Sequence, residues 1–203
     1  MSSIVLFGGT FDPPHLGHLA LCTLTRELLR PDKVILSVSR NPLKSGTTAT
    51  DQQRFAMTQL LAQDLNETGD CFQASDWELA QPDPSYTLET LQHLASQYPS
   101  AKLFLAIGED NYRIFSKWKS PDKILQMAEL LVFSRQVQSS PPSLLPEFPN
   151  AAVRFIKLDL PISSSTLRPE LAKPDQRKAA LRKIPSFVAR YIEEHHLYLA
   201  CES

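Results

Sequence analysis

The chain has 203 residues, of which 42% are hydrophobic and 21% charged, a composition typical of a globular protein with a full hydrophobic core. The net charge of −1 argues against a broad nucleic-acid-binding surface, and no apolar run approaches the roughly 20 residues that span a bilayer. Three scattered cysteines without metal-ligand spacing fit a reducing compartment. We therefore expect a single cytoplasmic domain, 1–203, with a helical C-terminal portion from about 163 to 203 and no nucleic-acid or membrane partner; the oligomeric state stays open.

Residues 4–19 read as a buried strand, a glycine turn, a proline pair and the first turn of a helix. The strand ends at Gly8 and Gly9, where the backbone can take angles closed to residues with a side chain. His15 and His18 are three residues apart, so we expect both on one face of the first helical turn. Free N–H groups and a partial positive charge make a helix N-terminus an anion site. This stretch therefore predicts a site for a polyphosphate.

The first helix is expected from about residue 14 to 29, and residues 33–38 form the next apolar strand. A strand, a helix and a second strand in succession indicate parallel pairing with a right-handed crossover. The loop that follows carries Arg40, Asn41 and Lys44. Ligands of an open parallel sheet lie beyond the carboxyl ends of its strands, so this loop is well placed to bind one. A solvated basic loop is an equally good interpretation of these residues alone.

Several helix starts can be placed from side chains that cap helices. Thr50 and Gln53 have the spacing of a capping box, in which each side chain satisfies a backbone N–H of the other residue. Ser85 is expected to cap a further helix. Ser120 followed by Pro121 combines a capping residue with a proline suited to the first helical position.

Four further apolar runs are predicted as strands: residues 71–75, 102–107, 129–133 and 153–158. Gly108 follows the second of these, and a glycine there leaves backbone exposed for a planar ligand. Asp110 is the kind of acidic residue that commonly binds a ribose hydroxyl. Trp118 and Arg135 follow later. On its own, Trp118 is more readily interpreted as a core residue than as a ligand contact, and Arg135 is nearly as readily a surface residue as a phosphate contact.

Residues 162–168, ISSSTLR, combine hydroxyl groups with an arginine. Ser and Thr favour helix starts, and their hydroxyls and backbone amides also bind phosphate oxygens. Arg168 adds a planar, permanently charged fork suited to a phosphate. From this segment alone, a capped helix with an exposed arginine is an equally good interpretation.

The order of elements predicts an α/β fold, a Rossmann-like, doubly wound and mostly parallel sheet of about five or six strands with helices on both faces. Motifs of several other protein classes are missing from the sequence: GxGxxG after a strand, GxxxxGK[ST], HExxH and paired CxxC. A dinucleotide fingerprint, a Walker loop and these zinc sites are therefore not expected.

Two ordered motifs carry a family resemblance. The string GTFDPPHLGH at residues 9–18, together with ISSSTLR, resembles the signatures of the nucleotidylyltransferase superfamily, which joins a nucleoside triphosphate to a phosphorylated acceptor and expels pyrophosphate. The segment PSYTLETL at residues 84–91 is similar to that of the bacterial nicotinate-nucleotide adenylyltransferase branch. The resemblance covers nearly the whole chain. It implies adenylyl transfer from ATP to nicotinate mononucleotide, giving nicotinate adenine dinucleotide in NAD biosynthesis.

The resemblance also implies two subsites and a catalytic set. The residues expected to bind ATP are Gly8, Gly9, Thr10, Phe11, His15, His18, Gly108, Asp110, Ser163, Ser164, Ser165, Thr166 and Arg168. The residues expected to bind nicotinate mononucleotide are Asn41, Lys44, Tyr86, Thr87, Trp118, Lys119 and Arg135. His18, His15 and Arg168 would be catalytic, with His18 at the reacting centre. Mg²⁺ would bridge ATP phosphates, with no metal site built by the protein itself.

The chain departs from the family pattern at two places. Residues 42–44 read Pro-Leu-Lys where two prolines, a histidine and a basic residue are usual, and Lys119 stands where many members have Tyr after the Trp. Three alternatives stay open: transfer to nicotinamide mononucleotide, transfer to phosphopantetheine, and a non-catalytic nucleotide sensor. Phosphopantetheine enzymes lack the PSYT and Trp118 features, and the intact His15, His18 and Arg168 argue against the sensor.

Overall fold

The computed structural model describes residues 2–40, 48–134 and 145–200. The strands are β1 (Ser3–Gly9), β2 (Lys33–Val38), β3 (Phe72–Ser75), β4 (Lys102–Gly108), β5 (Ala128–Ser134) and β6 (Val153–Lys157). The α-helices are α1 (Leu16–Leu29), α2 (Asp51–Asn66), α3 (Thr87–Gln97), α4 (Glu109–Arg113), α5 (Pro121–Met127), α6 (Ser164–Ala172), α7 (Pro174–Leu181) and α8 (Ser186–Glu194). A short 3₁₀ helix, η1 (Phe115–Lys117), lies between α4 and α5.

The strands form one sheet in the order β3-β2-β1-β4-β5-β6, and every neighbouring pair is parallel. The predicted doubly wound, Rossmann-like fold is thereby confirmed. The strand order reverses between β1 and β4, which are direct neighbours in the sheet. In such folds ligands bind in the crevice beyond the carboxyl ends of the strands at this switch point.

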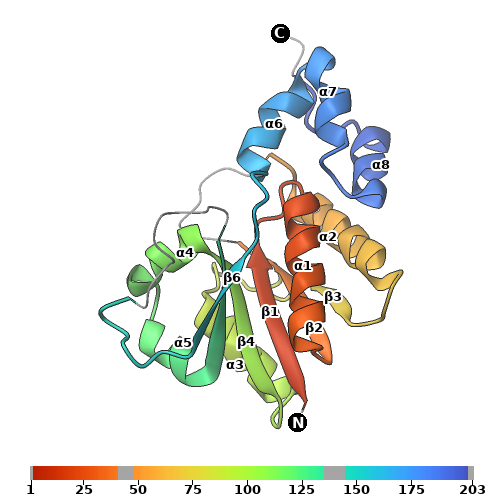
Figure 1. Ribbon diagram of the computed structural model, residues 1–203. Coiled ribbons are helices and arrows are strands. Elements are labelled where there is room, and N and C mark those ends of the chain that lie inside the picture. Colours follow the sequence, from red (N-terminus) through yellow and green to blue (C-terminus); the bar gives the residue numbers. More distant parts are fainter. Residues whose placement is uncertain (1, 41–47, 135–144, 201–203) are drawn as a thin grey trace.

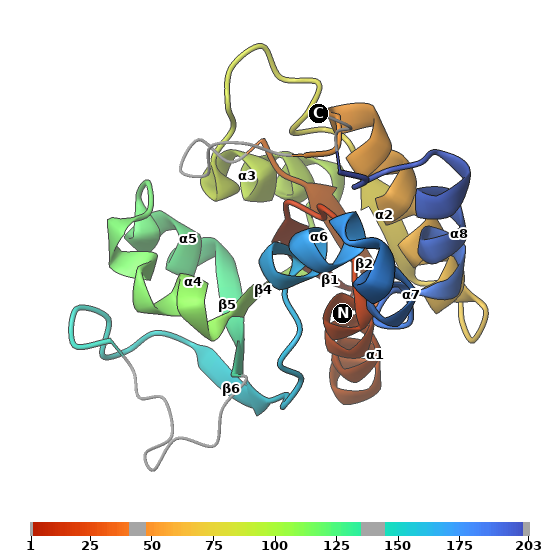
Figure 2. The same cartoon turned by 90° about the horizontal axis from the view of Figure 1, so that it is seen from above.

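The sheet is buried on both faces, as apolar strands without polar alternation require. Along β1, Val5 and Phe7 belong to one hydrophobic cluster, whereas Ile4 and Leu6 belong to the other, because successive side chains point to opposite faces. Residues of α1, α2 and α8 complete the first cluster, and residues of α3, α5 and η1 complete the second. The two groups of helices are seen on opposite sides of the sheet in Figure 2.

The C-terminal helices lie beyond the carboxyl ends of the strands, on the side of α1 and α2 (Figure 1). Leu167 and Leu171 of α6 and Val188 and Ile192 of α8 join the same hydrophobic cluster as Met57 of α2. Because α6 carries most of the ISSSTLR segment, this packing places the second motif above the end of β1.

Some helix starts differ from the predictions, while the capping box of Thr50 and Gln53 is confirmed. Helix α1 begins two residues later than expected, at Leu16. Tyr86, not Ser85, occupies the N-cap of α3, because the Ser85 hydroxyl donates to a buried carboxylate of Glu78 at 3.4 Å. Ser120 does precede α5 and its first-turn proline, but its backbone is left-handed, with φ 53°, and its side chain makes no capping hydrogen bond.

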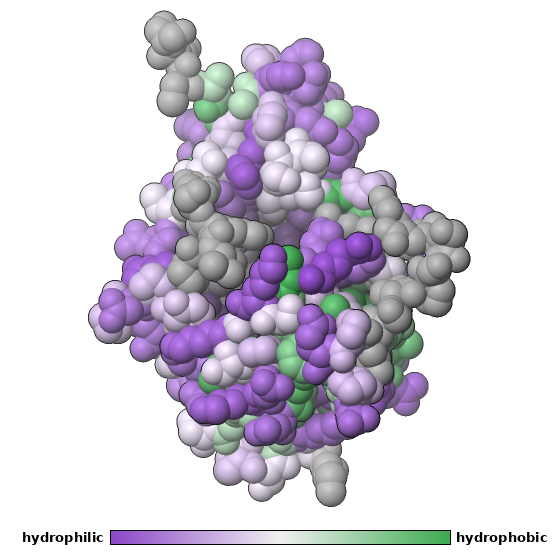
Figure 3. Space-filling view, turned by 90° about the vertical axis from the view of Figure 1, so that its left-hand side faces the viewer, coloured by the Kyte–Doolittle hydropathy of each residue, from purple (hydrophilic) through white to green (hydrophobic). Residues whose placement is uncertain are grey.

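Polar residues dominate the face of the molecule shown in Figure 3, and hydrophobic residues are exposed there only in small separate patches. The large hydrophobic residues that are exposed lie far apart in the described sequence: Leu28, Tyr86, Ile114 and Leu199. Within the same residues, no helix is long and apolar enough to cross a membrane.

Candidate active site

A cavity of about 240 Å³ opens at the carboxyl ends of β1 and β4, where the strand order reverses. The first loop, the start of α3 and the segment after η1 line it, together with apolar side chains of the sheet. Its lining includes Gly8, Gly9, Thr10, Ser39, Glu78, Tyr86, Thr87, Asn111, Trp118 and Lys119. Residues predicted for the ATP subsite and for the acceptor subsite therefore border one cavity.

The two glycines at the end of β1 do different things. A Cβ on Gly8 would meet no atom within 4 Å, so this part of the backbone faces open space in the cavity. A Cβ on Gly9 would lie 2.9 Å from the ring of Phe11, so the missing side chain makes room for that ring. The Phe11 ring is buried and packs against the rings of Phe7 and His18. Any contact of Phe11 with ATP would have to come from its backbone.

His15 and His18 form a capping box at the start of α1. His15 is the N-cap residue with extended backbone, so it lies just outside the helix and not in its first turn as expected. The backbone N–H of His15 donates to Nδ1 of His18, and the N–H of Gly17 donates to Nδ1 of His15, both at 3.1 Å. Because each Nδ1 accepts a hydrogen bond, the ring hydrogen of each histidine is assigned to Nε2.

Gly17 is required by the position of the His15 ring. A Cβ there would lie 2.9 Å from both Nδ1 and Cε1 of His15. The His15 ring is buried and stacks on the ring of His18 with 3.8 Å between centroids. The group that lies closest to the Gly17 backbone is therefore the ring of His15.

The two motifs meet through hydrogen bonds from α6 to the first loop. The Ser164 hydroxyl donates to the carbonyl of Pro13 at 2.9 Å, across 151 residues of sequence. The Arg168 guanidinium donates to the carbonyl of Asp12 at 2.8 Å, and its side chain remains 30% exposed. That exposed fraction leaves part of the fork able to bind an anion.

The remaining hydroxyls of the second motif cluster at the N-terminus of α6. Ser163 is the N-cap residue, and its Oγ accepts the backbone N–H of Thr166 at 3.2 Å. The Oγ atoms of Ser163 and Ser165 lie 3.0 Å apart, and Ser165 and Thr166 are exposed. Exposed hydroxyls at a helix N-terminus near an arginine suit phosphate oxygens.

Four of the predicted acceptor residues, Tyr86, Thr87, Trp118 and Lys119, line the cavity around the start of α3 and after η1, whereas His15, His18 and Arg168 are not among its lining residues. Lys119 donates to Glu89 at 2.8 Å, and its ammonium lies 4.3 Å from the centroid of the Tyr86 ring. This hydrogen bond raises the pKa of Lys119 and lowers the pKa of Glu89. Trp118 packs against the buried Phe115 while lining the cavity. The exposed ion pair between Lys119 and Glu89 contributes little stability, so a ligand carboxylate could compete with Glu89 for the Lys119 ammonium.

Other predicted residues are placed differently. Gly108 ends β4 with open space where a Cβ would be, whereas Asp110 is exposed in α4 and is not part of the cavity lining. Asn41, Lys44 and Arg135 lie outside the described residues.

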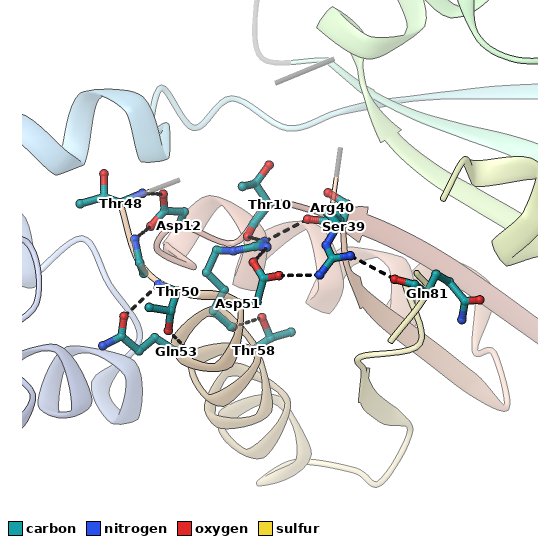
Figure 4. Close-up of polar contacts among 12 residues, drawn as sticks. Thr10, Asp12, Ser39, Arg40, Thr48, Thr50, Asp51, Gln53, Thr58 and Gln81 are labelled. Atoms are coloured by element: carbon teal, nitrogen blue, oxygen red, sulfur yellow. Dashed lines mark hydrogen bonds and ion pairs between the residues drawn. The ribbon is translucent and has the colours of Figure 1, made fainter. Parts of the chain in front are cut away.

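Buried charged residues hold the loops around the site, and the sequence carries no motif that marks them. Arg54 of α2 is 1% exposed and donates to the carbonyls of Thr10 and Ser39, at 2.7 and 3.0 Å. It also pairs with Asp51 at 2.7 Å, within the network shown in Figure 4. Arg54 therefore joins the loops that follow β1 and β2.

Glu78 is another buried ionisable residue at the site, and it lines the cavity. Its carboxylate accepts the hydroxyls of Ser37 at 2.7 Å and Ser85 at 3.4 Å. Burial raises the pKa of Glu78, and the hydroxyls that donate to it oppose the rise. Both Arg54 and Glu78 owe their positions to tertiary packing, which is why sequence reasoning missed them.

No group of three or more His, Cys, Asp and Glu side chains within residues 2–40, 48–134 and 145–200 is arranged to hold a metal ion. The carboxylate of Asp12 already accepts hydrogen bonds from Thr48, Ala49 and Tyr198. A divalent cation at this site would thus fit as an ion carried by the phosphates of a nucleotide.

Comparisons with known proteins agree with this geometry. A family model described as cytidylyltransferase-like matches residues 6–170. A protein of Chloroherpeton thalassium named "Probable nicotinate-nucleotide adenylyltransferase" is 49% identical over 198 residues, 98% of each chain. A protein of the same name from Chlorobium phaeovibrioides is 46% identical over 195 residues, 95% of this chain and 97% of the relative.

Among solved structures, the fold is similar to Plasmodium falciparum nicotinic acid mononucleotide adenylyltransferase complexed with NaAD, with a TM-score of 0.80. Sequence identity to that protein is 19%, and the similarity covers 98% of both chains, so this comparison supports the fold alone. Family membership rests on the family model and on the two relatives. The chain belongs to the cytidylyltransferase-like family and, within it, to the nicotinate-nucleotide adenylyltransferases.

Proposed function

We propose that the protein transfers the adenylyl group of ATP to nicotinate mononucleotide, giving nicotinate adenine dinucleotide and pyrophosphate in NAD biosynthesis. The observation that carries this proposal is the meeting of the two motifs, in which Ser164 and Arg168 hydrogen-bond to the carbonyls of Pro13 and Asp12. The pair of histidines, the exposed hydroxyls and the arginine supply several donors within one region, as a triphosphate requires. The names of the two close relatives support the same reaction.

The reaction is a direct displacement at phosphorus. A phosphate oxygen of nicotinate mononucleotide would attack the α-phosphorus of ATP, forming the new P–O bond, while the bond from the α-phosphorus to the oxygen bridging to the β-phosphate breaks. The electron pair of that bond leaves with pyrophosphate. No covalent intermediate with the enzyme is needed, so catalysis would rest on alignment and on stabilisation of charge.

The chain's own groups would divide this task. His15 and His18 would donate from Nε2 to phosphate oxygens of ATP, with His18 at the reacting phosphorus. Arg168 and the hydroxyls of Ser165 and Thr166 would steady the β- and γ-phosphates as pyrophosphate departs.

Mg²⁺ would enter with ATP, bound to its phosphate oxygens and to water. Such an ion neutralises charge on the phosphates when it is bound. Asp12 is a buried carboxylate beside Arg168, and its hydrogen bonds to Thr48, Ala49 and Tyr198 suit it to positioning more than to binding metal.

The nicotinate ring would lie in the part of the cavity bordered by Tyr86, Thr87, Trp118 and Lys119. The Lys119 ammonium, held by an exposed carboxylate of Glu89, would favour a substrate that carries a negative charge on its ring.

We also infer that the whole chain acts as one domain. The hydrogen bonds between its first loop and α6 support this inference. We further infer that the protein works in the cytoplasm, where ATP is available.

The experiment is an assay of pyrophosphate release from ATP with four acceptors in parallel: nicotinate mononucleotide, nicotinamide mononucleotide, phosphopantetheine and water alone. The proposal expects release with nicotinate mononucleotide well above the other three. Preference for nicotinamide mononucleotide or phosphopantetheine would reassign the acceptor. ATP binding without pyrophosphate release for any acceptor would indicate a nucleotide sensor and would overturn the enzymatic assignment.

A further inference from the structure

We propose that Tyr198, acting through Asp12, is a positioning residue for the phosphate-binding groups, so that the segment after α8 forms part of the active site. The Tyr198 hydroxyl donates to Oδ1 of Asp12 at 2.7 Å, across 186 residues of sequence. Both side chains are buried. The inference rests on the proposed use of ATP at this site.

Asp12 connects three parts of the chain. Its Oδ2 accepts the backbone N–H of Thr48 at 2.8 Å, and its Oδ1 accepts that of Ala49 at 3.1 Å, just before α2 (Figure 4). Its main-chain carbonyl accepts Arg168 of α6. Tyr198 donates a further hydrogen bond to the carboxylate. Any shift of Asp12 would therefore be transmitted to Arg168.

The phenol of Tyr198 is held as a donor. Burial and the nearby charge of Asp12 raise the pKa of Tyr198 well above its ordinary value, so the hydroxyl keeps its proton. A buried carboxylate that loses one of its donors keeps its desolvation cost without the compensating bond. Asp12 would then be expected to move toward another donor, and Arg168 lies only 3.9 Å from Oδ2.

A second set of bonds fixes the chain beside Tyr198. Both terminal nitrogens of Arg177 in α7 donate to the carbonyl of Leu197 at 3.2 Å, and Nη1 also donates to the carbonyl of Leu171 in α6 at 2.8 Å. Helix α6 is thus tied to the C-terminal segment at one end through Arg177. About one turn earlier in the helix, it is tied to the same segment through Arg168, Asp12 and Tyr198. This closed arrangement sets the position of α6 relative to the first loop.

The test compares Tyr198→Phe with Tyr191→Phe, a matched control on α8 whose ring contacts His195. Affinity for a non-hydrolysable ATP analogue is measured by calorimetry, together with kcat, the KM for nicotinate mononucleotide and the melting temperature. We expect Tyr198→Phe to weaken analogue binding and lower kcat by about tenfold each, the scale of losing a hydrogen bond to a charged group. The acceptor KM should stay within about twofold, and Tyr191→Phe should match the wild type.

A double-variant comparison separates positioning from stability alone. Asp12→Asn should weaken analogue binding at least as much as Tyr198→Phe, and the double variant should be no worse than Asp12→Asn, because both changes break one connection. Multiplied effects would overturn the inference, as would a Tyr198→Phe variant that melts earlier yet binds the analogue and turns over like the wild type. The affinity of Tyr198→Phe for the ATP analogue, relative to the wild type, tests the positioning role without any acceptor. Failure of nicotinate mononucleotide to serve as the acceptor would count against the proposed function and leave this test valid.

Discussion

The backbone N–H of His15 donates to Nδ1 of His18 at 3.1 Å, and the two rings stack with 3.8 Å between their centroids. The two histidines therefore hold each other, and they also start α1. One pair of side chains thus serves both the helix and the proposed phosphate site. A substitution at His18 must separate these two roles before it can be interpreted.

His18→Gln makes that separation, because Gln at the third helical position can keep the capping bond to the backbone. If His18 stabilises the reacting phosphate, both His18→Ala and His18→Gln should lower kcat by roughly 10²–10³. His18→Ala should also lose about 0.5–2 kcal/mol of stability with the cap, whereas His18→Gln should recover most of it. Steady-state kinetics and denaturant unfolding give the two readouts, and a His18→Gln enzyme with wild-type kcat would remove His18 from the mechanism.

Arg168 is expected to act in both ATP binding and turnover. Arg168→Ala should raise the KM for ATP and lower kcat together, because the guanidinium would contact the phosphates throughout the reaction. Arg168→Lys should restore only part of the loss, since an ammonium cannot bond a phosphate and the Asp12 carbonyl with the same fork geometry. Full rescue by lysine, measured as kcat/KM for ATP, would contradict a role for the fork.

Gly17→Ala tests whether the His15 ring needs its present position. The new Cβ would lie 2.9 Å from that buried ring, so we expect a loss of about 1–3 kcal/mol in unfolding free energy and a displaced His15. Gly8→Ala is the matched control for folding, because a Cβ there meets nothing within 4 Å. Unfolding curves should show Gly8→Ala near the wild type, and equal stability of the two variants would refute the packing argument.

The fold was predictable from local patterns, because short apolar runs that alternate with helical segments indicate buried parallel strands without knowledge of their partners. The site was only partly predictable. Ordered motifs point to His15, His18 and Arg168, yet the capping role of His15 depends on where its ring packs. Asp12 and Tyr198 bond across 186 residues, and no local signal can report a pairing of that kind.

Glu78 predicts a specific pH dependence of stability. Its pKa is raised above the ordinary value of 4.5 in the folded protein, so the folded state holds this proton more tightly than the unfolded state does. The contribution of the neutral carboxyl is therefore fully present below about pH 4.5 and is lost as the pH rises through the folded pKa. Glu78→Gln removes this ionisation while keeping the shape of the side chain.

The measurement is the free energy of unfolding of wild type and Glu78→Gln at several pH values from below 4.5 up to about 8. We expect the difference to shift in favour of Glu78→Gln as the pH rises. A difference that stays constant over this range would mean that Glu78 does not change its ionisation on folding.

The proposed reaction is adenylyl transfer to an acceptor that carries a ring carboxylate. Lys119 and the start of α3 border the cavity. Both oxygens of a ring carboxylate can accept hydrogen bonds from donors there, whereas the NH₂ group of an amide is itself a donor and would face one of them. Hydrogen bonds to charged groups contribute about 1.5–3 kcal/mol, so losing one or two should cost on the order of 10- to 10³-fold.

The most direct test is the ratio of kcat/KM for nicotinate mononucleotide to that for nicotinamide mononucleotide at saturating ATP. We predict a ratio between roughly 10 and 10³ in favour of the acid, reduced in Lys119→Gln. A ratio near one, or a preference for the amide, would contradict the assignment.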